Sequence, residues 1–380
     1  MILDRLAKAT LVSRLADYPA VLLVGPRQCG KTTLARSLGG AYFDLEQESD
    51  RLRLDLGWQD LVDGSTLVVL DEAQAWPAVF PRLRGAIDAI RTRNGRFLLL
   101  GSVSPALMAQ VSESLAGRLS QVDLTPLLWL EVREKTPLDA RWLQGGYPDG
   151  GLLQPGRFPR WQLDYLTLLA QRDFPTWGLP AKPATTDRLF RMVAALHGQV
   201  WNASQVGQSL GLSYHTVNDY LDYLEGAFLV RRLRPFHANV RKRLAKRPKV
   251  YWRDSGLLHA LLRVTTFDVL LAQPWVGASW EGFVIEEILG VLSARGAVFE
   301  AHYFKTSDLY EADLVLDLGH ERWVVEIKLT SSPSQADMSR LDRIGEIVGA
   351  TRRVLVSQTR IPIGNDARLS CGLEDLLQRL

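Results

Sequence analysis

The sequence predicts an α/β fold in which helices cover both faces of a parallel sheet. Three observations support this prediction. Short apolar runs, expected as strands, lie at residues 20–24, 41–45, 67–70 and 97–100. Helical stretches separate them, notably residues 79–93. Apolar strands that alternate with helices are typical of a buried parallel sheet. The third observation is a glycine-containing loop that directly follows the first run.

This loop carries a complete G-x-x-x-x-G-K-T motif. An apolar strand precedes it and the helix-prone residues 33–38 follow, which is the context that a phosphate-binding loop requires. Glycines let backbone N–H groups turn inward, and the N-terminus of the next helix favours an anion. This context disfavours the alternative of a glycine-rich turn with a chance lysine. We expect ATP or GTP to bind at Gly25, Pro26, Arg27, Gln28, Cys29, Gly30, Lys31, Thr32 and Thr33.

Polar residues at the ends of two later strands complete the expected nucleotide site. Lys31 can reach the β- and γ-phosphates, while Thr32 and Asp71 suit Mg²⁺. Glu72 is the candidate base that activates the attacking water. Ser102, after the fourth strand, could contact the γ-phosphate or that water. An Asp-Glu pair alone could simply cap a helix, but its order and spacing after the phosphate-binding loop favour catalysis.

Composition limits the class of protein. A chain of 380 residues is long for one core, so two or three domains are expected. Its only cysteines, Cys29 and Cys371, exclude a disulfide framework and a cysteine-rich zinc site. No apolar run reaches the ~18 residues of a membrane span. Charges at Asp4 and Arg5 come too early for a secretory signal. We therefore expect a cytoplasmic protein with no membrane partner.

Several short motifs together resemble one family, the AAA-type ATPases that carry a C-terminal domain of unknown function numbered 4143. The motifs are residues 25–33, 70–74, 101–105, 113–118, 145–148 and 172–174. The resemblance runs over nearly the whole chain, although Val103 departs from the small polar residue that relatives usually carry. It implies an AAA-like sheet domain, ATP and Mg²⁺ as cofactors, and self-association into a ring, expected to be a hexamer.

The same resemblance gives Arg118 a role. In AAA-type rings an arginine after the fourth strand reaches the γ-phosphate of the neighbouring subunit, and Arg118 lies in the matching position. The alternative is that Arg118 caps a helix or pairs with Glu113.

Four segments follow from the pattern of elements. They are an AAA-like P-loop core at 1–126, a helical lid at 127–185, a winged helix at 186–253 and a nuclease-like domain at 254–380. The third segment has a helix-turn-helix signature, with helices expected at 188–197, 203–210 and 214–225 and a hairpin starting near residue 228.

The hairpin region is strongly basic. Residues 226–253 contain no Asp or Glu, and such a stretch attracts the phosphates of DNA. The second helix offers Tyr214, His215 and Asn218 rather than arginines, which argues against strong base readout. A solvated face or a subunit-packing role is the alternative. The candidate DNA-binding residues are Arg231, Arg232, Arg234, Arg241, Lys242, Arg243, Lys246 and Arg247.

The C-terminal segment has an αβββαβ order that resembles the PD-(D/E)xK nuclease core. Asp313 and Glu326 lie on adjacent expected strands and could converge on a divalent cation, with Lys328 orienting the water. Glu281 on the preceding helix could supply a further carboxylate, with Glu286 as the second choice. The alternative is a salt-bridged cluster in a fold that has lost nuclease chemistry.

These observations favour ATP hydrolysis coupled to remodelling of DNA or translocation along it. One alternative is a metal-dependent DNA endonuclease gated by the ATPase. Another is an ATP-switched regulatory scaffold that binds protein partners. The acid-free basic stretch at 226–253 favours the two DNA-directed readings over the scaffold.

Overall fold

The chain folds into two compact units. The computed structural model describes residues 3–101, 113–179, 182–237, 247–306 and 310–380. The first unit contains residues 1–127 with the short segments 226–228 and 293–296. The second unit contains residues 128–225, 229–292 and 297–380. Most residues of the lid, winged-helix and nuclease-like segments that the sequence suggested therefore lie in the second unit.

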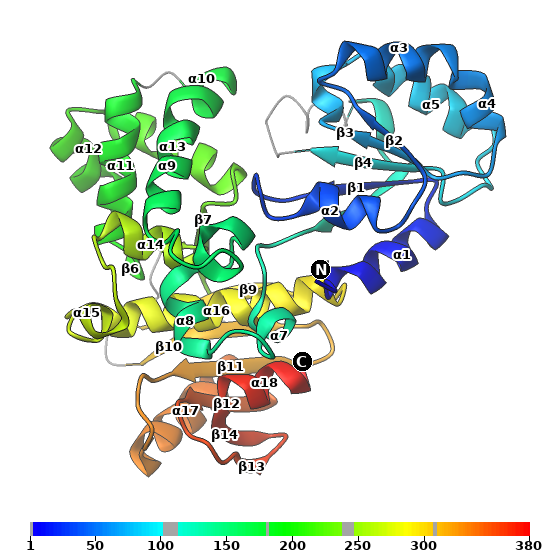
Figure 1. The fold of residues 1–380 in the computed structure, drawn as a ribbon. Coiled ribbons are helices and arrows are strands. Elements are labelled where there is room, and N and C mark those ends of the chain that lie inside the picture. The colour runs from blue at the N-terminus through cyan, green and yellow to red at the C-terminus, as the bar shows by residue number, and fades with distance from the viewer. Residues whose placement is uncertain (1–2, 102–112, 180–181, 238–246, 307–309) are drawn as a thin grey trace. The chain divides into compact units, whose positions relative to one another are not determined.

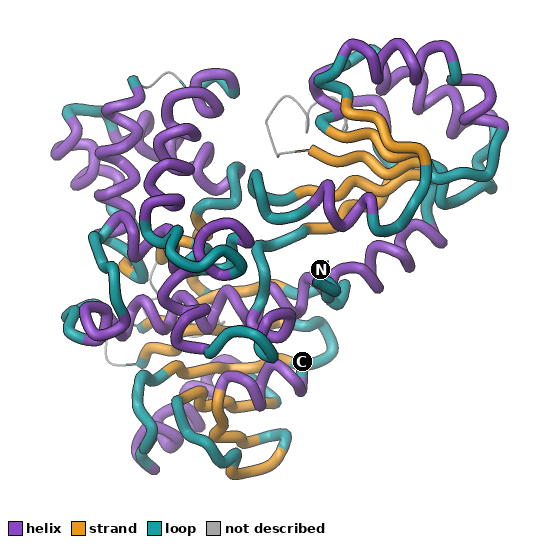
Figure 2. Tube along the Cα trace, in the orientation of Figure 1, coloured by secondary structure: helices purple, strands orange, loops and turns teal. Residues whose placement is uncertain are grey.

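A five-stranded sheet forms the centre of the first unit, with the order β2-β3-β4-β1-β5. Its strands are β1 (Ala20–Val24), β2 (Ala41–Asp44), β3 (Val68–Asp71), β4 (Phe97–Gly101) and β5 (Leu119–Asp123). Every pairing in this sheet is parallel. The predicted parallel sheet is confirmed, and its carboxyl ends meet at one edge because all its strands run in the same direction. Figure 2 shows the strands of this sheet side by side.

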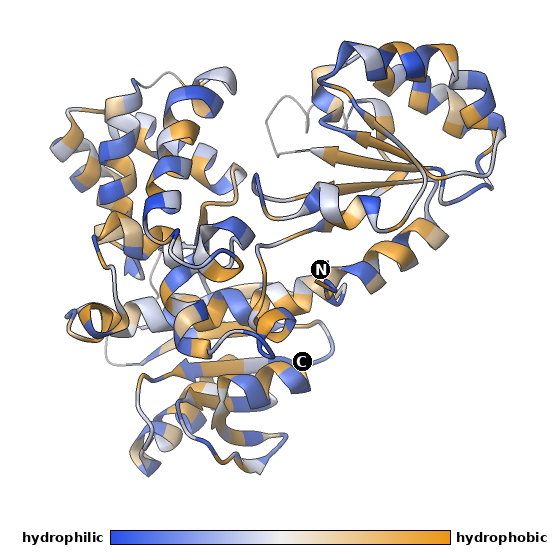
Figure 3. Cartoon of the chain, viewed as in Figure 1, coloured by the Kyte–Doolittle hydropathy of each residue, from blue (hydrophilic) through white to orange (hydrophobic). Residues whose placement is uncertain are grey.

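Helices cover both faces of this sheet. They are α1 (Ala7–Asp17), α2 (Lys31–Arg36), α3 (Glu48–Leu56), α4 (Trp58–Asp63) and α5 (Val79–Ala89). Figure 1 shows α3, α4 and α5 on one face, with α1 and α2 on the other. All five residues of β1 are buried, which is why the strand is apolar throughout rather than alternating (Figure 3). Helix α5 ends before residue 93, where the sequence placed its end, because Ile90 leaves the helical conformation.

Two helices of the second unit occur where the helix-turn-helix signature was read. Helix α12 (Ala203–Leu210) follows α11 (Pro183–Ala195), and α13 (Tyr214–Gly226) follows a short turn. The Asn202 side chain caps α12 by accepting a hydrogen bond from the Gln205 N–H. The turn uses Gly211 at φ 69°, a left-handed conformation that favours glycine.

The remaining helices of the second unit are mostly short. They are α7 (Trp129–Val132), α8 (Leu138–Gln144), α9 (Arg160–Leu168), α10 (Phe174–Thr176), α14 (Ser255–Leu261), α15 (Phe267–Leu271), α16 (Val276–Ala294), α17 (Gln335–Val348) and α18 (Leu373–Arg379). Trp142 of α8 is fully buried and meets Trp280 of α16 edge to face, with ring centroids 5.0 Å apart.

A nine-stranded sheet crosses the second unit in the order β13-β14-β12-β11-β10-β9-β7-β8-β6. Its strands are β6 (Gln199–Val200), β7 (Val230–Pro235), β8 (Lys249–Trp252), β9 (Glu300–Lys305), β10 (Glu311–Asp317), β11 (Arg322–Ile327), β12 (Arg352–Ser357), β13 (Ile363–Asn365) and β14 (Arg368–Gly372). Strand β7 pairs in parallel with β9, joining Arg234 to His302. The hairpin of β7 and β8 therefore continues into the C-terminal sheet.

Several cations of the acid-free stretch form ion pairs within this unit. Arg231 and Arg253 both donate to Glu286 of α16, each with an N–O distance of 3.0 Å to Oε2. Arg232 of β7 pairs with Asp222 of α13 at 2.6 Å. Buried Lys249 of β8 bridges Glu281, at 3.2 Å, and Glu311, at 2.9 Å. These cations therefore hold the hairpin to α13, α16 and β10.

We expect Glu286→Gln to destabilise the protein. Burial would raise the pKa of Glu286, but Arg231 and Arg253 outweigh it and hold that pKa below its ordinary value. Removing the charge takes away the carboxylate that two largely buried guanidiniums share, at a cost of about 2–4 kcal/mol. A carboxylate with a lowered pKa contributes stability that is present above its unfolded pKa and lost as pH falls through the folded pKa. The difference from wild type should therefore shrink in acid.

Thermal unfolding at pH 7 and at pH 4 checks this expectation. Glu374→Gln is the control. Glu374 forms an ion pair with Arg133 at an N–O distance of 3.0 Å, but both side chains are exposed, and such pairs contribute little to the free energy of unfolding. Equal losses in the two variants, or a loss for Glu286→Gln that grows in acid, would contradict the assignment.

Candidate nucleotide site

The phosphate-binding loop is fixed from both sides. It runs from β1 into α2 and uses left-handed backbone at Gln28 (φ 62°) and Gly30 (φ 103°). A Cβ on Gly25 would lie 2.1 Å from the carbonyl oxygen of Leu124, so only glycine fits there. The buried Arg5 side chain donates to the carbonyl of Cys29 at 2.9 Å. Its second nitrogen donates to the carbonyl of Thr125 at 2.7 Å, beyond the end of β5.

Lys31 lies folded against this loop. Its Nζ donates to the carbonyl oxygens of Gly25, at 3.0 Å, and Pro26, at 2.9 Å. Lys31 is buried, with 7% of its surface exposed. An ammonium held by carbonyl oxygens at the mouth of a phosphate-binding loop can exchange them for phosphate oxygens.

Asp71, at the end of β3, accepts hydrogen bonds from three sides. Its Oδ2 accepts from the hydroxyls of Thr32 and Tyr42, both at 2.7 Å. Its Oδ1 accepts from the N–H of Glu72 at 3.0 Å. Burial first, and then the Asp71 carboxylate, raises the pKa of Tyr42, so its hydroxyl keeps the proton that it donates. Asp71 therefore has one fixed orientation beside the loop.

Glu72 follows Asp71 in a strained backbone. Its φ of 47° places a non-glycine residue in the left-handed region. Burial raises the pKa of Glu72, while the amide of Gln74, which donates to this carboxylate, and the Lys31 ammonium oppose the rise. A carboxylate with a raised pKa is better suited to act as a base near neutral pH.

The strand order places β4 between β3, which ends in Asp71, and β1, which leads into the phosphate-binding loop. In the register, Val24 of β1 lies opposite Gly101 of β4, and Leu70 of β3 lies opposite Leu99. The end of β4 is therefore at the same edge as the loop and Asp71. Ser102, which follows β4, lies outside the described residues.

Arg118 lies at the opposite edge of this sheet. It precedes β5, whose first residue, Leu119, is opposite Ala20 at the amino end of β1. Its guanidinium makes a two-pronged ion pair with Asp88 of α5, with both N–O distances at 2.9 Å. Arg118 therefore lies away from the phosphate-binding loop of this chain, and its ion-pair partner is Asp88 rather than Glu113.

The predicted DNA-binding residues fall into three groups. Arg231 and Arg232 are held in the ion pairs described above. Arg234 and Arg247 are exposed, and the described part of the chain places no carboxylate in an ion pair with either. The others, Arg241, Lys242, Arg243 and Lys246, lie outside the described residues.

The residues predicted for a second metal site, Glu281, Asp313 and Glu326 with Lys328, are held in contacts within the protein, and the site stays a prediction. No cluster of His, Cys, Asp or Glu suited to hold a metal occurs among the described residues. Lys328 pairs with Glu326 at 2.6 Å, and the N–H of Ile327 donates to Asp313 at 2.8 Å. Burial, together with Glu281 and Glu326, raises the pKa of Asp313 well above its ordinary value.

A cation outside the predicted metal motif lies among these carboxylates. Lys249, from β8, reaches Glu281 and lowers the pKa of Asp313, which opposes the effect of the neighbouring carboxylates. Lysine ammonium groups thus pair with Glu281 and Glu326, two of the carboxylates that a metal would need. Sequence reasoning missed Lys249, as it missed Tyr42, Arg5 and Asp88, because each acts on a residue distant in the sequence.

Family comparisons assign three segments of the chain to known domain families. Residues 17–133 match the AAA domain family, and residues 276–370 match a domain of unknown function, DUF4143. Residues 135–268 match another domain of unknown function, DUF8612. Among solved structures, the Walker-type ATPase PABY2304 of Pyrococcus abyssi is 18% identical with a TM-score of 0.49, covering 69% of this chain and 96% of that one. No described helix is long and apolar enough to cross a membrane.

Two curated relatives match almost the whole chain. The uncharacterized proteins Mb2031c of Mycobacterium bovis and Rv2008c of Mycobacterium tuberculosis are each 37% identical to it over 386 residues. Each match covers 98% of this chain and 86% of the relative. The chain therefore belongs to the same family as these mycobacterial proteins, and its residues 17–133 are an AAA domain of the P-loop ATPase type.

Proposed function

We propose that this P-loop ATPase hydrolyses Mg²⁺-ATP at the carboxyl edge of its first sheet and uses the energy to remodel DNA or move along it as a homo-oligomeric ring. The observation that carries the ATPase part is the hydrogen bond from Thr32 to Asp71 at 2.7 Å, next to buried Lys31. It brings together, from the start of α2 and the end of β3, the hydroxyl, carboxylate and ammonium that nucleotide chemistry requires.

Each residue has a physical role in this proposal. Mg²⁺ supplies positive charge that stabilises the phosphates in the transition state. Thr32 can offer its hydroxyl oxygen to the cation while its proton remains donated to Asp71. Lys31 exchanges the carbonyls of Gly25 and Pro26 for phosphate oxygens. Glu72, with its raised pKa, accepts a proton from the attacking water.

Tyr42 positions Asp71 within this site. The hydroxyls of Thr32 and Tyr42 both donate to Asp71 Oδ2. Tyr42 therefore keeps Asp71 in place when the Thr32 oxygen binds the cation. The Tyr42 ring is held in turn by Arg36, whose guanidinium carbon lies 4.2 Å from the ring centroid. Tyr42 is a positioning residue, because it touches Asp71 and not the phosphates.

Two features support the ring and the DNA. Arg118 lies at the edge of the sheet opposite the phosphate-binding loop, as an arginine that acts on a neighbouring subunit must. Arg234 and Arg247 are exposed and flank the basic residues 241–246 of the same stretch, which gives phosphates a sequence-independent attraction. The nuclease alternative has less support, because Lys249 pairs with Glu281 and Lys328 pairs with Glu326.

Two substitutions test the ATPase roles. Lys31→Ala should abolish ATP binding, because the ammonium that contacts the phosphates is gone. Glu72→Gln should bind ATP as wild type but turn it over roughly 100-fold more slowly, in line with loss of a general base. Nucleotide binding and steady-state phosphate release measure the two effects. DNA should raise wild-type turnover, and wild-type turnover in Glu72→Gln would refute the role of Glu72.

Tyr42→Phe should raise the Mg²⁺ concentration needed for half-maximal turnover by about threefold to tenfold. The ring and its contact with Arg36 remain, and only the hydroxyl that holds Asp71 is lost, a change of about 1 kcal/mol. ATP hydrolysis titrated with Mg²⁺ is the measurement. Tyr18→Phe is the control, since Tyr18 precedes β1 at the opposite edge. An unchanged Mg²⁺ dependence would show that Tyr42 is only structural.

Mixed assemblies test Arg118. Arg118→Ala subunits keep a complete nucleotide site, and Asp71→Ala subunits keep the arginine. Each alone should hydrolyse ATP poorly. Mixing them should restore part of the activity, because an Asp71→Ala subunit can supply its arginine to the site of an Arg118→Ala neighbour. If mixing restores nothing while both variants remain folded, the ion pair of Arg118 with Asp88 is its whole role.

A further inference from the structure

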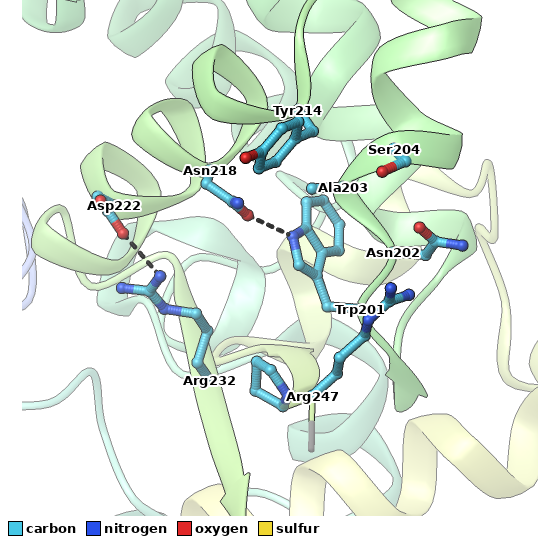
Figure 4. Close-up of a pocket in the computed structure, with 10 residues that line it drawn as sticks. Trp201, Asn202, Ala203, Ser204, Tyr214, Asn218, Asp222, Arg232 and Arg247 are labelled. Carbon is cyan, nitrogen blue, oxygen red and sulfur yellow. Dashed lines mark hydrogen bonds and ion pairs between the residues drawn. The ribbon is translucent and has the colours of Figure 1, made fainter. Parts of the chain in front are cut away.

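A pocket on the second unit contains none of the residues of the ATP site. It has a volume of about 520 Å³, within the range of small-molecule sites. Its walls come from the start of α12, from α13, from β7 and from the residues just before β8. Figure 4 shows Tyr214 and Asn218 on α13 beside the Trp201 ring.

The wall on α13 combines an aromatic ring with a fixed amide. Tyr214 is half exposed and packs against His215, with ring centroids 3.8 Å apart, so the exposed part of its ring can stack on a flat ligand. Trp201 is buried, and its Nε1 donates to Asn218 Oδ1 at 3.0 Å. Because this bond orients the Asn218 amide, its NH₂ group remains as a donor for a ligand. The wall therefore suits a flat ring with hydrogen-bond acceptors on its edge.

The opposite wall offers one cation to a ligand. Arg232 lines the pocket but is held by Asp222 at 2.6 Å and also by Glu225. Arg247 also lines the pocket, is exposed, and has no ion pair within the described ranges. A ligand that satisfies both walls has a heteroaromatic ring and an anion, which is the chemistry of a nucleotide.

Helix α13 is poorly suited to enter the major groove of duplex DNA. It carries Asp219, Asp222 and Glu225, and it has no Lys or Arg from Tyr214 to Gly226. Asp219 and Asp222 are exposed, so groove insertion would bring carboxylates towards phosphates. A single strand avoids this repulsion, because an unpaired base can enter the pocket while its backbone stays near Arg247.

We infer that this pocket binds an unpaired base of single-stranded DNA, with the base stacked on Tyr214 and an adjacent phosphate on Arg247. The inference rests on the DNA-binding part of the proposed function and specifies its substrate. Stacking on an aromatic side chain tolerates any base, so the pocket adds affinity for single strands with little sequence preference.

Fluorescence of 2-aminopurine in an oligonucleotide tests the inference on the full-length protein. The probe is quenched when it stacks, and fluorescence anisotropy gives affinity for the same oligonucleotide as a single strand and as a duplex. Wild type should bind the single strand more tightly and quench the probe. Tyr214→Ala should weaken single-strand binding roughly tenfold and abolish quenching, whereas Tyr214→Phe should retain both.

Arg247→Gln should lower the log–log salt slope for the single strand by about 0.7. Arg234→Gln is the matched control, an exposed arginine that does not line the pocket, and should weaken single-strand and duplex binding alike. ATP turnover without DNA should equal wild type in all four variants, which confirms that they fold.

The outcomes separate the two proposals. If DNA binds but Tyr214→Ala matches wild type in affinity and quenching, or duplex binds as tightly as the single strand, the pocket inference is overturned and DNA binding stands. If neither form of DNA binds at any salt concentration, both the pocket inference and the DNA-binding part of the proposed function fail.

Discussion

The carboxylate of Asp71 is the point on which the first unit depends. Parallel pairing of β3, β4 and β1 brings the end of β3 to the same edge as the phosphate-binding loop. There Asp71 accepts the hydroxyls of Thr32 and Tyr42, one from the helix after the loop and one from β2. A single acceptor thus fixes β2, β3 and the start of α2 relative to one another, because a buried carboxylate must keep its donors.

The second unit is organised by charge in a different way. Its acid-free stretch is basic in sequence, yet Arg231, Arg232, Lys249 and Arg253 find carboxylates on α13, α16 and β10. Parallel pairing of β7 with β9 extends the hairpin into the C-terminal sheet and brings these partners within reach. The stretch therefore holds the unit together, and only its exposed cations remain for phosphates.

Structural features that depend on adjacent residues could be predicted from the sequence. Contacts that depend on the pairing of distant segments could not. The phosphate-binding loop and α12 follow from adjacent residues, namely the glycine-lysine motif and the Asn202 cap. Tyr42 donates its hydrogen bond to Asp71 only because β2 pairs with β3, and no pattern of adjacent residues predicts the register of that pair. Lys249 of β8 likewise reaches Glu281 of α16 only through the tertiary fold. Strand β13 is short and exposed, and it gave no apolar signal.

The central claim is that Lys31, Thr32 and Asp71 form one Mg²⁺-nucleotide site, and an experimental structure with Mg²⁺ and a non-hydrolysable ATP analogue tests it most directly. The account predicts that Lys31 Nζ leaves the carbonyls of Gly25 and Pro26 for phosphate oxygens. It also predicts that Thr32 contacts the cation while Asp71 keeps its bond from Tyr42. An analogue bound elsewhere, or Lys31 still on the two carbonyls with the analogue in the loop, would contradict it.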